Sequence, residues 1–147
     1  MNVTHENFNI PKNVVKICTT LKECGECAWV VGGSIRDLTM GAVPADWDLA
    51  TTAVPKKMMS TFKRVIPTGI DHGTVTIMIG GDPFEITTLR REGPYSDRRR
   101  PDSVDYVRDI ELDLSRRDFT VNAMAYDPLT AELHDPFGAR QDISKKI

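Results

Sequence analysis

The chain has 147 residues and a net charge of −2, with 40% of the residues hydrophobic and 27% charged. This length fits one domain with its own core, and this composition is typical of a soluble globular protein. No apolar run reaches the roughly 20 residues that span a bilayer, and residues 1–10 lack the basic and apolar segments of a secretory signal. We therefore expect a cytoplasmic protein that does not contact membranes.

The N-terminal segment is expected to be a leader followed by a helix. Residues 1–10 show no strong pattern and predict a loose leader, so that the folded domain would span residues 11–147. Asn9 and Pro11 are typical of a helix start, apolar residues then follow at helical spacing, and Gly25 is typical of a helix end.

Short strands and helices, separated by turns, account for most of the remaining chain. In chain order we expect a buried strand over 28–31, a helix over 34–39, strands over 47–50, 65–66, 74–79 and 84–89, a helix from Pro55, a helix over 112–125 and a hairpin over 126–138. Strands that alternate with helices over so short a span predict an α+β fold, with a small mixed sheet and helices packed on one face.

The three cysteines offer two interpretations. Cys24 and Cys27 form a Cys-x-x-Cys pair, which is compatible with redox activity or with half of a zinc site. A structural zinc site needs four ligands, and the sequence contains no second pair. Free thiols near a helix end are the favoured interpretation.

A glycine pair followed by an arginine and two aspartates forms the candidate site. Gly32 and Gly33 would let backbone N–H groups approach phosphate oxygens, and Arg36 would add a forked donor. On a strand, Asp46 and Asp48 would point to one face and offer Mg²⁺ two hard oxygen ligands. Taken alone, the glycines are also typical of a tight turn and the aspartates of a solvated strand edge.

The arginine-rich stretch from Arg90 to Asp118 is not uniformly basic. It holds eight arginines against eight aspartates and glutamates, so a continuous basic groove is not predicted. Each arginine can still bind an individual phosphate. Residues 93–104 within it are polar, charged and proline-bearing, which predicts a mobile loop.

Taken together, the motifs from residue 12 to residue 145 resemble the head domain of class II tRNA nucleotidyltransferases. This family contains CCA-adding enzymes and bacterial poly(A) polymerases and belongs to the polymerase-β-like superfamily. The motifs that carry the resemblance are Val-Gly-Gly-Ser-Ile-Arg-Asp at 31–37, Asp-Trp-Asp-Leu-Ala-Thr at 46–51, His-Gly-Thr-Val at 72–75, Phe-Glu-Ile-Thr-Thr at 84–88, the loop segment 95–104, Arg-Arg-Asp-Phe-Thr-Val-Asn-Ala at 116–123 and Asp-Pro-Phe-Gly at 135–138.

The resemblance implies a role for each site residue. Asp46 and Asp48 would hold catalytic Mg²⁺, and Glu85 would be a third catalytic carboxylate on a neighbouring strand. The residues implied in nucleotide binding are Gly32, Gly33, Ser34, Arg36 and Arg117.

The resemblance further implies transfer of CMP and AMP, from CTP and ATP, to the 3′ end of tRNA by a two-metal mechanism. Neck, body and tail domains, which this sequence does not contain, would hold most of the tRNA. The segment 92–104 has the full length seen in enzymes that add the whole CCA or only its adenosine. Two alternatives stay open: the head of a bacterial poly(A) polymerase, and a non-catalytic nucleotide-binding module.

Overall fold

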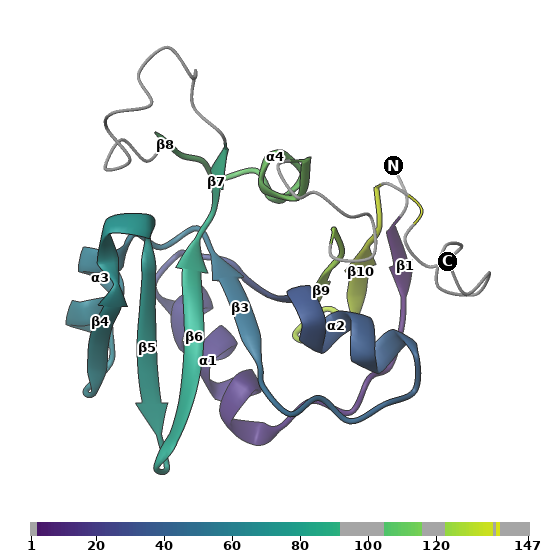
Figure 1. Ribbon diagram of the computed structural model, residues 1–147, viewed down its shortest axis with the longest axis horizontal. Helices are drawn as coiled ribbons and strands as arrows, with labels where there is room; N and C mark the ends of the chain where they lie inside the picture. Colours follow the sequence, from purple (N-terminus) through teal and green to yellow (C-terminus); the bar gives the residue numbers. More distant parts are fainter. Residues whose placement is uncertain (1–2, 92–104, 116–122, 137, 139–147) are drawn as a thin grey trace.

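A computed structural model describes residues 3–91, 105–115, 123–136 and 138. Its main feature is an eight-stranded sheet in the order β1-β10-β9-β2-β3-β6-β5-β4, beside a two-stranded sheet of β7 and β8 (Figure 1). The elements are β1 Val3–His5, α1 Lys12–Glu23, β2 Ala28–Val31, α2 Gly32–Thr39, β3 Asp48–Thr51, α3 Pro55–Thr61, β4 Val65–Gly69, a 3-10 turn Ile70–His72, β5 Thr74–Ile79, β6 Asp82–Thr88, β7 Arg90–Arg91, β8 Asp105–Tyr106, α4 Ile110–Ser115, β9 Ala125–Asp127 and β10 Glu132–His134.

The sheet is mixed because β3 and β6 run parallel, whereas the other neighbouring strands of this sheet pair antiparallel. The β3–β6 connection contains α3 and the β4–β5 hairpin, which gives it enough length to bring the chain back in the same direction. β2 lies between β9 and β3, and all four of its residues are buried. This position explains its unbroken apolar sequence.

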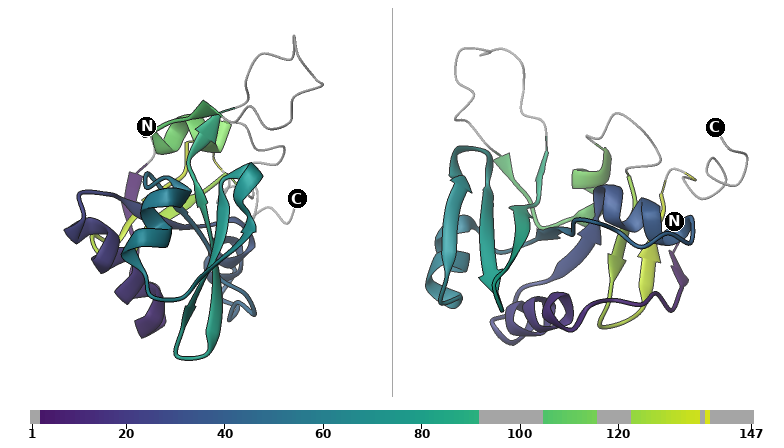
Figure 2. Two further views of the ribbon diagram at one scale, coloured as in Figure 1. Left: turned by 90° about the vertical axis from the view of Figure 1, so that its left-hand side faces the viewer. Right: turned by 60° about the horizontal axis from the view of Figure 1, so that its bottom comes forward.

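Two hydrophobic clusters lie on opposite faces of the sheet, because neighbouring strand residues alternate between them. Val30 and Leu49 belong to the larger cluster, whereas Trp29 and Ala50 belong to the smaller one. Helices α1, α2 and α3 contribute to the larger cluster, and Figure 2 shows α1 and α3 on the same side of the sheet. The helical residues buried there are Val14, Ile17, Cys18, Leu21, Ile35 and Met58. The predicted α+β fold with a mixed sheet is confirmed, but the expectation that the helices pack on one face was wrong, because α4 buries its apolar residues in the smaller cluster on the other face.

Helix α4 packs on the smaller cluster through Ile110 and Leu114. The sequence predicted a helix over 112–125, but α4 ends at Ser115 and Ala125 begins β9. The prediction was wrong at Ala125 because this residue pairs with Val31 of β2 and is fully buried in the sheet. Residues 116–122 lie outside the described part of the chain.

The N-terminal segment is more ordered than the loose leader predicted from sequence. Strand β1 pairs with β10, with Val3 opposite His134. The apolar pattern gave no signal because backbone pairing forms this edge strand while its side chains stay largely exposed. Helix α1 also starts later than Asn9 suggested, since Pro11 is its N-cap residue.

Several other elements were predicted correctly. The bounds of β2 and β5 agree with the structure, α3 begins at Pro55, and β9 and β10 form the hairpin expected over 126–138. Glycines and prolines mark these boundaries, and their local conformational preferences act without tertiary context. Within the described ranges, every helix is too short or too polar to cross a bilayer.

Candidate active site

The centre of the site is a pair of carboxylates on adjacent parallel strands. Asp48 of β3 lies directly opposite Glu85 of β6 in the strand register. The next residue of each strand, Leu49 and Ile86, points into the larger hydrophobic cluster, so the two carboxylates point to the other face. Neighbouring strands lie about 4.8 Å apart. Two acidic side chains that are 37 positions apart in sequence therefore emerge side by side.

Asp46 precedes this pair in the chain but is not on the strand. The expectation that both aspartates belong to one strand was wrong, because pairing with β2 begins only at Asp48, opposite Val31. Asp46 occupies a bend before β3 and is exposed. Trp47, between the two aspartates, packs against the larger cluster as expected from its position.

Gly32 leaves space open next to the Asp48 carboxylate. Its φ of +67° is a left-handed conformation that favours glycine, and a Cβ built on it would lie 3.3 Å from Asp48 Oδ2. Helix α2 also begins at Gly32, and its N-cap residue Val31 makes no side-chain cap. The first backbone N–H groups of the helix therefore lie next to the carboxylates, at the helix end that attracts phosphate.

Ser34 holds this junction together from inside. Its side chain is only 2% exposed, and its hydroxyl donates to the Val31 carbonyl oxygen at 2.8 Å. The same hydroxyl oxygen accepts a hydrogen bond from the Asp48 backbone N–H at 3.4 Å. Ser34 thus links the end of β2, the first turn of α2 and the first residue of β3. The sequence did not indicate this positioning role, because the role depends on a contact across 14 residues.

Arg36 brings positive charge to the glycine turn. Its Nη2 lies 3.4 Å from the position that a Cβ on Gly33 would occupy, so the guanidinium folds back over the start of α2. Its Nε is 3.7 Å from Asp37 Oδ1, and 41% of the Arg36 side chain is exposed. An exposed guanidinium over free backbone donors is suited to bind a phosphate group.

The donor set at the site fits a hard divalent cation. Asp48 and Glu85 supply carboxylate oxygens, which Mg²⁺ prefers, and the absent Cβ of Gly32 leaves room beside Oδ2. Across the described ranges, however, no three His, Cys, Asp or Glu side chains converge closely enough to form a metal centre. Arg117, predicted to bind nucleotide, and the segment 92–104, which includes the predicted mobile loop, lie outside those ranges.

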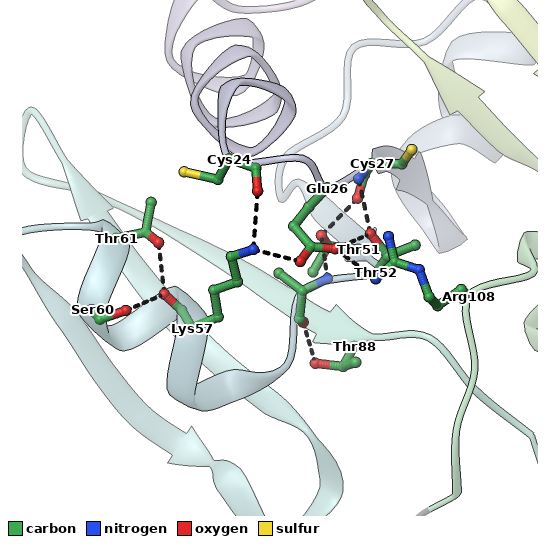
Figure 3. Close-up of polar contacts among 11 residues, drawn as sticks. Cys24, Glu26, Cys27, Thr51, Thr52, Lys57, Ser60, Thr61, Thr88 and Arg108 are labelled. Atoms are coloured by element: carbon green, nitrogen blue, oxygen red, sulfur yellow. Dashed lines mark hydrogen bonds and ion pairs between the residues drawn. The ribbon is translucent and has the colours of Figure 1, made fainter.

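A second polar cluster lies at the opposite end of β2 and β3 (Figure 3). Glu26, only 8% exposed, accepts hydrogen bonds from Lys57 Nζ at 2.8 Å, Thr52 Oγ1 at 2.7 Å and Arg108 Nη1 at 2.9 Å. Burial by itself raises the pKa of Glu26, but these three donors outweigh it and lower the pKa to about 2. The cluster is a structural junction, which the sequence did not indicate.

The cysteines beside this junction are free thiols. Figure 3 shows the sulfur atoms of Cys24 and Cys27 pointing away from each other, and both residues are exposed. Cys18 is buried, and burial together with nearby Asp127 raises its pKa to about 12. The favoured interpretation of free thiols agrees with this arrangement.

Comparison with known proteins identifies the relatives of this chain. It is 45% identical over 135 residues to the CCA-adding enzyme of Bacillus cytotoxicus, covering 92% of this chain but 34% of that protein. A CCA-adding enzyme from Bacillus cereus is also 45% identical, over 139 residues. The chain thus spans about a third of the length of the curated relatives it matches.

Solved structures give the same result. The Bacillus stearothermophilus CCA-adding enzyme, solved in complex with CTP, matches with a TM-score of 0.79 and 40% identity, over 89% of this chain and 31% of that one. A tRNA nucleotidyltransferase, solved with a primer tRNA and an incoming ATP analog, matches with a TM-score of 0.69 and 30% identity, over 88% of this chain and 37% of that one. The resemblance noted from the motifs is confirmed. Residues 28–147 match the poly A polymerase head domain, and the chain belongs to this family.

Proposed function

We propose that this chain is the catalytic head of an RNA nucleotidyltransferase that adds CMP and AMP, from CTP and ATP, to the 3′ end of tRNA. The observation that carries the proposal is the Asp48–Glu85 pair, which faces a glycine turn at the start of a helix. CCA-adding enzymes among the relatives, including one bound to CTP, support the choice of substrate.

The proposed site assigns the triphosphate to the glycine turn. Backbone N–H groups at Gly32 and Gly33 would bind phosphate oxygens, and Arg36 would neutralise part of their charge. By family resemblance, Arg117 would add a second guanidinium. Ser34 fixes the first residue of β3 against this turn. The bound phosphates would therefore keep a constant position relative to the carboxylates.

The carboxylates would hold the catalytic ions. Asp48 and Glu85 would act together with Asp46, whose exposed side chain would have to turn toward the pair. When bound, Mg²⁺ would lower the pKa of the attacking hydroxyl and stabilise the leaving phosphate oxygens.

The reaction would be an in-line displacement at the α-phosphorus. The RNA 3′-oxygen forms a new bond to phosphorus, the bond to the pyrophosphate oxygen breaks, and the hydroxyl proton is released. The protein residues would position both reactants and balance the charge on the triphosphate rather than form a covalent intermediate.

The test is the Asp48→Asn variant of the full-length protein. We expect nucleotide transfer to fall by at least ~1000-fold, because a neutral amide loses the charge that binds the ions while keeping the side-chain shape. The matched control is Asp82→Asn, which changes an exposed aspartate at the start of β6. Near-normal transfer by Asp48→Asn would contradict the proposal. Loss of transfer with retained Mg²⁺-triphosphate binding would also contradict the assigned role.

A further inference from the structure

Beyond Glu85, the face of the sheet that carries the carboxylates is lined with threonines. Thr87 follows Glu85 by two positions on β6 and therefore points to the same face. Thr74 of β5 lies opposite Thr87, and Thr76 lies opposite Glu85. The register thus places hydroxyl groups next to the carboxylates, on the side away from the glycine turn. We call Thr74 and Thr87 the threonine pair.

The hydroxyls of the threonine pair lie 2.8 Å apart and share a hydrogen bond. Two hydroxyls carry two hydrogens, and one of these forms the shared bond. The other is left to donate to a group above the sheet, and the side chains of Thr74 and Thr87 are both partly exposed. Thr76 is less available, because it is only 8% exposed and its hydroxyl is bonded to Thr68 at 2.9 Å.

The order of the strands places the glycine turn and the threonine pair on opposite sides of β3. The glycine turn follows β2, which lies on one side of β3, whereas β6 and β5 lie on the other side. In an in-line displacement the attacking and leaving oxygens stand on opposite sides of the phosphorus. If the leaving pyrophosphate is bound at Gly32 and the line of displacement crosses the strands, the attacking hydroxyl approaches over β6, above Glu85.

An aromatic ring lies next to the start of β5. Tyr106 of β8 lies against Gly73, the residue before Thr74, so closely that a Cβ on Gly73 would be 2.9 Å from Tyr106 Cε1. The Tyr106 side chain is 37% exposed. Partly exposed aromatic rings and hydroxyl donors both suit single-stranded RNA, in which bases stack and the sugar-phosphate backbone accepts hydrogen bonds.

We propose that the surface of β6 and β5 binds the 3′-terminal nucleotide of the acceptor RNA, with the threonine pair donating a hydrogen bond to its sugar-phosphate backbone. The inference rests on the proposed function and assigns to the acceptor a surface separate from the triphosphate site. It makes Thr74 and Thr87 acceptor-binding residues rather than strand-forming residues alone.

The test is steady-state kinetics of the double variant Thr74→Val/Thr87→Val in the full-length protein. Valine keeps the branched shape that suits a strand but removes the hydroxyl. We expect the KM for the RNA acceptor to rise about tenfold, because the variant loses a hydrogen bond to the charged RNA backbone. The KM for CTP should stay unchanged. Serine at both positions should restore the acceptor KM, because it returns the hydroxyls.

The matched control is Thr20→Val on α1, whose hydroxyl bonds to the Lys16 carbonyl oxygen. It should change neither KM. An unchanged acceptor KM in the double variant would overturn the inference, as would an equal rise in both KM values. Either result leaves the proposed function intact as long as Asp48→Asn abolishes transfer, so the two failures can be told apart.

Discussion

At the scale of single residues, the site depends on one missing side chain. Gly32 has a positive φ, and a Cβ there would lie 3.3 Å from Asp48 Oδ2. We expect Gly32→Ala to cost about 1–2 kcal/mol in stability from backbone strain. We also expect it to lower transfer by more than about tenfold, because the methyl group occupies space beside the carboxylate.

Gly25→Ala is the matched control for this prediction. Gly25 has a φ of +83° but no atom within 4 Å of the added Cβ, so it reports the backbone strain alone. Denaturant unfolding and transfer assays on both variants separate the two effects. If Gly25→Ala lowers transfer as much as Gly32→Ala, the space beside Asp48 has no special role.

Residue-level prediction from sequence was most successful where the chemistry is local. The glycine pair lies next to Arg36 and Asp48, as the sequence motif suggested, because each residue has an intrinsic conformational or charge preference; their functional roles stay a prediction. The inward hydroxyl of Ser34 and the bend at Asp46 were missed. Both depend on where β2 and β3 begin to pair, and this register is a property of two distant segments.

At the scale of elements, Glu26 joins the start of β2 to α3 and to the segment after β8. Its pKa of about 2 lies below the ordinary value of 4.5. A lowered carboxylate pKa adds stability that is fully present above about pH 4.5 and is lost as the pH falls toward 2. Because Lys57 and Arg108 are 40% and 66% exposed, solvent weakens both ion pairs.

We therefore expect Glu26→Gln to cost about 1–2 kcal/mol at pH 7 and to flatten the acid side of the stability profile. Urea unfolding of wild type and variant at several values between pH 7 and pH 2.5 measures this, and the difference should shrink toward the acid end. The control is Glu23→Gln, an exposed glutamate on α1. A difference that stays constant with pH would show that ionisation of Glu26 does not matter.

Element bounds were predictable where a helix or strand begins or ends at glycine or proline, as at β2, β5 and α3. They were not predictable for β1, whose pairing with β10 depends on backbone hydrogen bonds rather than on a buried apolar pattern. The start of β9 was hidden for a related reason. Its apolar residues are compatible with a helix as well as with a strand, and only the pairing with Val31 of β2 selects the strand.

At the scale of the whole molecule, the proposed site would contact only groups that all nucleoside triphosphates share. The glycine turn and Arg36 suit phosphates, and the carboxylates suit Mg²⁺. We expect this chain alone to bind nonhydrolysable CTP and ATP analogues weakly in the presence of Mg²⁺, with dissociation constants within about threefold of each other. Isothermal titration calorimetry measures both, and Asp48→Asn should weaken both equally. Tight and selective binding of CTP would contradict this prediction.

The pairing of β1 with β10 also constrains the order of folding. Val3 and His134 stand next to each other in the sheet although almost the whole chain separates them (Figure 1). During synthesis β1 emerges well before β10 and has no partner until β10 has followed. Closing so long a loop is entropically costly, so this edge completes after the β5–β6 hairpin, whose strands are joined by a two-residue turn. Until then the early strand must stay unpaired, and its exposed polar side chains protect it from pairing with another chain.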